Sequence, residues 1–349
     1  MTRLTRVLPL LSALGALVLT LVVAAGALAL GGHEPMAAFG ALIGGAFGSW
    51  DVFLSITLVR TVPLLLTGLA VALAFRAGVW NIGAEGQLYA GAVAAAAVGL
   101  AGGGLPAVLL VPLVLAASCG AGLLWAAVPA LMRVRLGVGE VITTLLMNFV
   151  GIHLAAWMVH GPLQESRGVF PQTDPIAEAA RLPVLFEGTR LHAGLLLALL
   201  LAFGLWVLLR STRVGFSIRT VGASPEAART AARTDVSRIV LGVFLASGAL
   251  AGLAGGVEVS GVTFALYENL SPGHGYTAIA VALLAGLHPL GVVATAVFFG
   301  ALEGGAGAMQ RQVGVPAAWV GGIEALAILT VLAVDRAVRT ALRSRGPGP

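Results

Sequence analysis

Long apolar runs alternate with short polar segments along most of the chain, and this pattern predicts an all-α bundle of membrane-spanning helices. A span needs about 20 largely apolar residues, and eight runs come close to that length or exceed it: 7–30, 53–75, 79–100, 105–132, 141–160, 192–209, 239–257 and 316–334. A further run, 276–302, is interrupted at Pro289. Proline breaks helices, so we expect two short segments there that cross or dip back. The eight runs and the two short segments make ten membrane segments.

The arginines at the ends of these runs predict which side each loop faces, because basic residues favour the cytoplasmic side. Arginines before 7–30, within 210–238 and within 335–349 place both chain ends and the segment 210–238 inside. The segments 31–52 and 161–191 lack such a basic excess, so we expect them outside. The chain is then one transmembrane domain with a first span 7–30, an external segment 31–52, a first helical group 53–160, an external loop 161–191, a span 192–209, a cytoplasmic loop 210–238, a second helical group 239–334 and a cytoplasmic tail 335–349.

Composition supports the membrane class and limits the chemistry of the chain. Hydrophobic residues make up 58% and charged residues 10% of the sequence, whereas soluble domains carry about 25% charge. No lysine occurs, so the lysine-containing loop that cradles nucleotide phosphates is missing. If ATP drives this protein, another subunit hydrolyses it. The six histidines lack acidic or cysteine partners at metal-binding spacing, and the net charge of +5 lies in short loops, so we expect neither a metal site nor nucleic-acid binding.

A polar segment interrupts the apolar pattern at residues 81–87, where the flanking sequence predicts membrane. Lipid cannot satisfy amide or carboxylate groups, so Asn81, Glu85 and Gln87 must face protein or a wet cavity. A second polar break, 271–275, precedes another apolar run. Paired discontinuous helices in an internal repeat are typical of a transport pathway at the membrane midplane. Chance recurrence of turns in a glycine-rich chain is the alternative.

We therefore take Asn81, Glu85 and Gln87, together with Asn148 in the middle of the run 141–160, as candidate residues of a substrate pathway. Amides and carboxylates could donate hydrogen bonds to a polar solute and accept them from it. Two alternatives remain open. The first three side chains could instead satisfy backbone groups freed by the neighbouring glycines, and Asn148 could form hydrogen bonds between helices.

The cytoplasmic segment 222–233 predicts a short helix that is too polar to span. Ser224 is a favourable N-cap, Pro225 suits the first helical position and Glu226 favours the positive end of the helix dipole. A short helix between two spans has the form of a docking element for a cytoplasmic partner. The alternative is an amphipathic connector on the membrane surface.

Two further features are expected to hold helices together. Gly248, Gly252 and Gly256 recur at every fourth position, which predicts a close-packing stripe on one helix face. Glu140 lies close to Arg133 and Arg135 in the sequence, and we expect a local ion pair there.

The triplet Glu226-Ala227-Ala228 resembles the coupling-helix motif of ABC importer permeases, although Ala232 stands where those permeases commonly have glycine. Other segments are similar, in the same order, to the permeases that import nucleosides and simple sugars: 75–87, 137–144 with Met147 and Asn148, 270–279 and 289–292. Among these, the chain most resembles the longer permease of bacterial nucleoside importers that work with a basic-membrane-lipoprotein-type binding protein.

This resemblance implies a multi-pass subunit of the bacterial cytoplasmic membrane that performs no catalysis and works by alternating access. It implies three protein partners besides membrane lipid: an ABC ATPase that carries ATP and Mg²⁺, a second and different permease, and an external substrate-binding lipoprotein. The ATPase is expected to couple through Ser224, Pro225, Glu226, Ala227, Ala228 and Arg229. The rival hypotheses are a stand-alone transporter that moves protons through Glu85 or Glu324, and a structural subunit without a pathway.

Overall fold

The structure, a computed structural model, describes residues 18–230 and 234–316, together with 319, 321–322, 325–326 and 329–330. This described part is helical apart from turns, loops and two isolated bridges, and it contains six helices long and apolar enough to cross a membrane. A seventh span results if the bent pair Val18–Leu30 and Pro35–Phe47 counts as one. The predicted all-α, multi-pass class is therefore confirmed.

The helices after Val18–Leu30 are α2 (Pro35–Phe47), α3 (Trp50–Val52), the π-helical turn η1 (Phe53–Leu58), α4 (Val59–Arg76), α5 (Ala84–Ala101), α6 (Ala107–Leu136), α7 (Glu140–His160), the 3-10 turn η2 (Glu178–Ala180), α8 (Gly194–Ser211), α9 (Arg213–Ala223), α10 (Pro225–Thr230), α11 (Val236–Glu258), the π-helical turn η3 (Val259–Thr263), α12 (His274–Leu284) and α13 (Pro289–Val313). The chain divides into two compact units, which are Met1–Thr57 with Phe299–Pro349 (unit 1) and Leu58–Phe298 (unit 2).

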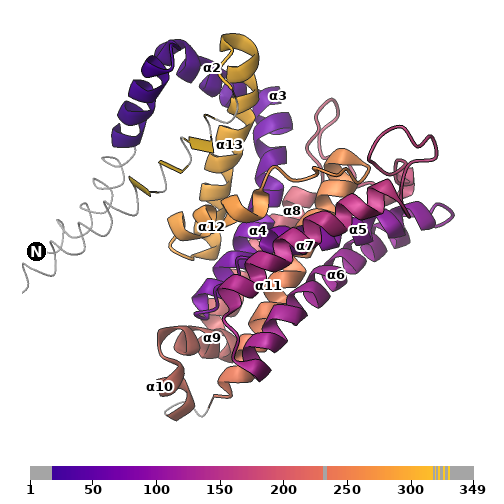
Figure 1. Ribbon diagram of the computed structural model, residues 1–349, viewed down its shortest axis with the longest axis vertical. Coiled ribbons are helices and arrows are strands. Elements are labelled where there is room, and N and C mark those ends of the chain that lie inside the picture. Colours follow the sequence, from indigo (N-terminus) through magenta and orange to yellow (C-terminus); the bar gives the residue numbers. More distant parts are fainter. Residues whose placement is uncertain are drawn as a thin grey trace, which may run out of the picture. The chain divides into compact units, whose positions relative to one another are not determined.

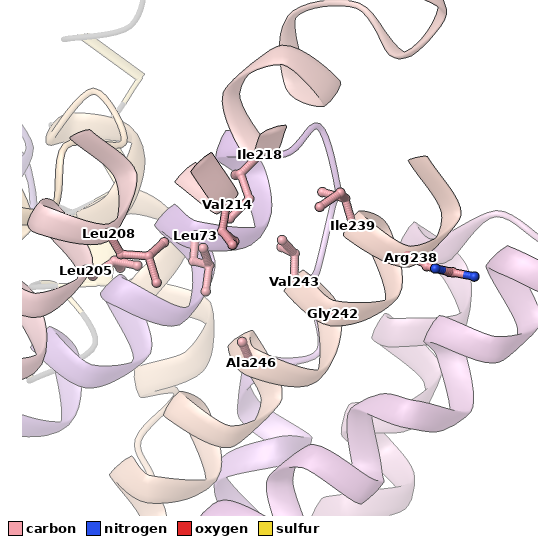
Figure 2. A pocket seen from close by; sticks show the side chains of 10 residues that line it. All are labelled: Leu73, Leu205, Leu208, Val214, Ile218, Arg238, Ile239, Gly242, Val243 and Ala246. Carbon is pink, nitrogen blue, oxygen red and sulfur yellow. The ribbon is translucent and has the colours of Figure 1, made fainter. Parts of the chain in front are cut away.

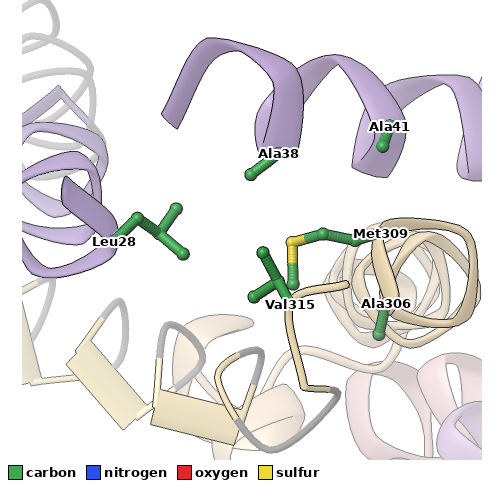
Figure 3. Close-up of a cluster of buried hydrophobic side chains, with 6 residues drawn as sticks. All are labelled: Leu28, Ala38, Ala41, Ala306, Met309 and Val315. Carbon is green, nitrogen blue, oxygen red and sulfur yellow. The ribbon is translucent and has the colours of Figure 1, made fainter. Parts of the chain in front are cut away.

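Unit 1 has its own apolar core, which forms between α2 and the last turns of α13 (Figure 3). Its buried side chains are Leu28, Ala38, Ala41, Ala306, Met309 and Val315. Small residues let the two helices approach closely, because a Cβ on Gly45 would collide with Ala308. Sequence reasoning described 31–52 only as an external segment and missed α2 within it, since 13 residues are too few for a span.

Unit 2 is a helical bundle in which α11 packs against α6, α5 and α4 (Figure 1). The glycine stripe of α11 faces α6. A Cβ on Gly248 would meet Gly122, and one on Gly252 or Gly256 would meet Ser118. Small side chains on both helices thus bring the two backbones into contact, which favours dispersion attraction in lipid.

Substituting Gly252 by alanine is expected to loosen this helix pair, because the new methyl group would overlap the Ser118 carbonyl and the Gly122 backbone. Overpacking of this kind costs about 1–3 kcal/mol. The thermal midpoint of the purified protein in detergent should fall by several degrees. Gly242→Ala on the same helix is the matched control, since nothing lies within 4 Å of a Cβ there. An equal midpoint for both variants would contradict the close packing.

Some predicted boundaries were wrong. The helix expected from residue 79 begins only at Ala84, because Gly78 adopts a left-handed backbone (φ 71) and a non-helical loop follows. The break near Pro289 is confirmed, but α13 extends for 25 residues to Val313 and is no short half-segment. Its second half is rich in glycine, which weakens the hydropathy signal, although Gly305 is needed for a close approach to Leu42.

Candidate functional site

The polar segment 81–87 lies buried inside unit 2, between the end of α4 and the first turn of α5. Asn81 and Gln87 are 0% and 1% exposed. Asn81 Nδ2 donates to Gln87 Oε1 (3.0 Å) and to Ser247 Oγ of α11 (2.9 Å), and its Oδ1 accepts from the Gly83 amide (3.0 Å). These bonds close the loop on itself and fasten it to α11.

Residues of α7 hold the other side of this loop. Asn148 Oδ1 accepts from the Gly86 amide, and its Nδ2 donates to the Ile82 carbonyl, both at 2.8 Å. The Ile82 amide donates to Thr144 Oγ1 at 3.2 Å. Asn148 therefore pairs with backbone groups of the loop and of the first turn of α5, and so bonds α7 to α5. Hydrogen bonding between helices was the alternative that the sequence left open for Asn148.

The two polar breaks of the sequence meet in space. Glu85 Oε2 accepts from the Gly275 amide at 2.6 Å, and the Ser271 amide donates to Tyr89 Oη at 3.2 Å. Ser271 Oγ also accepts from the amides of Gly273 and His274 at the start of α12. Glu85 is only 2% exposed. Its carboxylate lies in the first turn of α5 and against the first turn of α12, where both helix dipoles favour negative charge.

The predicted ion pair of Glu140 is confirmed, with Arg133 as its partner, and it extends the contacts of the loop. Glu140 Oε1 also accepts from the Trp80 amide at 3.2 Å. The rings of Phe75 and Trp80 lie in contact, with their centroids 4.7 Å apart and their planes tilted by 55°. The loop between α4 and α5 is thus tied to the ends of α6 and α7.

The predicted short helix is α10, and Figure 1 shows it with α9 at one end of unit 2. Ser224 Oγ accepts from the Ala227 amide at 3.2 Å, which confirms the N-cap, and Pro225 is the first helical residue. Glu226, Ala227 and Arg229 are exposed, whereas Ala228 is buried. Residues 231–233 of the predicted segment lie outside the described residues.

The helix pair α9–α10 rests directly on the end of α4. A Cβ on Gly222 would collide with the carbonyl oxygen of Arg76, and one on Gly78 would lie 3.5 Å from Gly222 Cα. Behind α10 lies a cavity of about 450 Å³ lined by Ala77, Gly78, Arg133, Val134, Val221, Gly222, Pro225, Arg229, Val236, Ser237 and Val240. Helix α9 therefore contacts the end of α4 and the start of the α4–α5 loop, and α10 next to it has free space beside it.

A smaller pocket of about 230 Å³ opens where the apolar face of α9 meets α4, α8 and α11 (Figure 2). Val214 and Ile218 of α9 face it, and the guanidinium of Arg238 points away from the apolar side chains. Because its walls are apolar, this pocket offers few partners for the hydroxyl groups of a sugar. Sequence reasoning missed α9, whose 11 residues are too few for a span.

Sequence reasoning also missed Ser247 and Tyr89, which take part in these hydrogen bonds. Each is an isolated hydroxyl within an apolar run, and in lipid such a group seeks a partner. That signal could have identified them. The described residues contain no cluster of three or more histidine, cysteine or acidic side chains that could hold a metal ion. Glu324 and residues 335–349 lie outside the described residues.

Comparison with known proteins gives a consistent result. A family model described as the permease component of a branched-chain amino acid transport system matches residues 53–332. The glucose ABC transporter permease protein TsgB13 of Haloferax volcanii is 40% identical, over 94% of this chain and 89% of its own length. The guanosine ABC transporter permease protein NupP of Bacillus subtilis is 38% identical, over 88% of this chain and 89% of its own length. The guanosine ABC transporter permease protein NupQ of the same organism is 29% identical, over 72% of this chain and 80% of its own length. No solved structure matches the chain.

Proposed function

This chain belongs to the family of permease components named for branched-chain amino acid transport systems, and from that premise we propose that it is the membrane-spanning subunit of an ATP-driven importer for a nucleoside or a simple sugar. The curated relatives named for guanosine and for glucose support this substrate class. The chain is a transport component, and it catalyses no reaction itself.

The observation that carries the proposal is the exposed helix α10 on a chain of this family. Its Glu226, Ala227 and Arg229 side chains are open to a partner, while Gly222 of the adjoining helix α9 packs against the end of α4, where the α4–α5 loop begins. An ATPase that binds ATP and Mg²⁺ would dock at residues 224–229 and move α9 and α10 as it closes. The end of unit 2 that carries α9 and α10 is then cytoplasmic, in agreement with its arginines.

The junction of α5 and α12 is proposed to border the solute pathway. Asn81, Glu85, Gln87 and Asn148 are buried and bonded within the protein, so they shape the pathway by fixing the backbone of residues 80–87. The solute would meet surfaces that this chain forms with a second permease. Bacillus subtilis has two permease proteins named for guanosine, NupP and NupQ, and this favours a heterodimer.

The remaining features follow from the same proposal. An external lipoprotein would deliver the solute, and the chain would lie in the cytoplasmic membrane with ten segments and both ends inside. The external segment 31–52, the external loop 161–191 and the cytoplasmic loop 210–238 would keep the sides that their charges indicate.

Reconstitution tests the function directly. We expect proteoliposomes that contain this chain, its ATPase and the second permease to take up radiolabelled guanosine or glucose when the binding protein and ATP are present. The chain alone should take up neither solute, with or without a proton gradient. Uptake by the chain alone would contradict the proposal and favour the proton-coupled transporter.

A further inference from the structure

The loop between α7 and α8 is held in place by hydrogen bonds along its length, and it presents apolar side chains at two turns. Val169 and Phe170, here called the first tip, are 68% and 60% exposed. Phe186, the second tip, is 54% exposed. Figure 1 shows this loop at the end of unit 2 opposite to α9 and α10. Both tips therefore lie on the external side if α10 faces the ATPase.

The first tip is organised by one carboxylate. Glu165 Oε1 accepts from the amides of Val169 (3.2 Å) and Phe170 (2.9 Å), and Oε2 accepts from Gln172 Nε2 (2.6 Å). The Glu165 amide donates back to the Gln172 carbonyl at 2.8 Å. The hydrogen bond from Gln172 and those from the backbone lower the pKa of Glu165, so the carboxylate stays ionised and the turn stays closed at neutral pH.

The second tip is a tight hairpin. The Leu185 amide donates to the Leu191 carbonyl at 2.8 Å, and Thr189 Oγ1 donates to the Phe186 carbonyl at 2.8 Å. The Phe186 side chain therefore projects outward from a backbone whose conformation is already fixed. An aromatic side chain on a fixed backbone loses little conformational entropy when a partner covers it.

The loop is also joined to the external end of α11. The Leu182 amide donates to the Ser260 carbonyl in η3 at 2.9 Å, and the Ile176 amide donates to the Phe264 carbonyl at 2.8 Å. The Thr173 amide donates to the Leu266 carbonyl at 3.0 Å. A force applied to the tips would therefore reach α11, whose Ser247 accepts a hydrogen bond from Asn81.

We propose that the two tips are the contact points on which the external solute-binding protein docks. Glu165 keeps the backbone of the first tip in the conformation that this partner binds. The inference rests on the proposed importer function and names the contact surface for one of its partners. Exposed aromatic side chains that are rigid and surrounded by polar groups match the core and rim of a protein interface. Glu187 and Arg167 flank the tips with opposite charges. Insertion of the tips into lipid would instead carry these charged side chains toward the membrane, which is costly.

The test uses the assembled importer in nanodiscs and titrates its own binding protein while ATP hydrolysis is measured. Phe170→Ser combined with Phe186→Ser should raise the half-saturating concentration of the binding protein by about 10-fold or more, as expected when interface anchors are removed. Basal hydrolysis without the binding protein should stay unchanged. Glu165→Gln should raise the half-saturating concentration less, because the tips remain while their turn loosens. Phe203→Ser on α8 is the matched control at 54% exposure and should leave it unchanged.

An unchanged half-saturating concentration in the double variant would overturn the proposal. A second measurement covers the case in which the double variant fails to assemble. Phe170→Cys in a Cys119→Ala background carries a bimane label, whose emission should shift when the binding protein is added. Quenching of that label by brominated lipids, without a shift on adding binding protein, would assign the tip to the membrane. Absence of ATP hydrolysis or uptake in the unmodified complex would instead contradict the importer function.

Discussion

Substituting Gly222 by valine is expected to stop solute uptake while ATP hydrolysis continues. Gly222 lies in the last turn of α9 and rests on the carbonyl oxygen of Arg76, where even a Cβ would collide. The larger side chain must push α9 and α10 away from the α4–α5 loop. Helix α10 keeps its cap and its exposed residues, so the ATPase can still dock, but its movement would no longer reach the loop.

The measurement is the ratio of solute transported to ATP hydrolysed in proteoliposomes. Misplacing a packed contact by overpacking costs about 1–3 kcal/mol, so uptake per ATP should fall by roughly 10-fold or more. Gly204→Val in α8 is the matched control, because nothing lies within 4 Å of a Cβ there. A normal ratio in Gly222→Val would show that α10 acts on the membrane helices by another route.

The sequence predicted the helical class and most spans because lipid imposes a simple rule, which is a long apolar run for every crossing. That rule does not apply to α2 and α9. Both are shorter than a membrane is thick, and they owe their stability to packing against other elements. The same rule places the end of α13 too early. Its glycines permit close packing, but they lower the hydropathy, and a drop in hydropathy indicates the end of a span.

The candidate site was predictable in its residues but not in its contacts. Polar side chains in an apolar context mark Asn81, Glu85 and Gln87 directly. Their partners are remote in the chain, since Ser247 lies 166 residues from Asn81 and Gly275 lies 190 residues from Glu85. Such pairings depend on how the helices pack, and a single sequence does not show this. For the same reason, the sequence alone did not decide whether these polar side chains line a solute pathway or only hold the structure together.

Removing the carboxylate of Glu85 is expected to have the largest effect on folding. In Glu85→Ala the Gly275 amide loses its acceptor in a site that excludes water, and the first turns of α5 and α12 lose a negative charge. An unsatisfied buried donor costs about 1–3 kcal/mol, and the lost dipole interactions add up to about 2 kcal/mol. The amount of folded protein recovered from membranes should therefore fall several-fold, whereas Glu178→Ala, at an exposed position, should leave it unchanged.

Glu85→Gln separates this structural role from proton transport. Glutamine keeps an oxygen that can accept from the Gly275 amide, but it cannot carry a proton across the membrane. We expect folded Glu85→Gln protein to retain uptake, with the same dependence on external pH as the unmodified importer. A transporter that moves protons through Glu85 would lose uptake completely in this variant. Retained uptake with an unchanged dependence on external pH would assign Glu85 a structural role at the junction of α5 and α12.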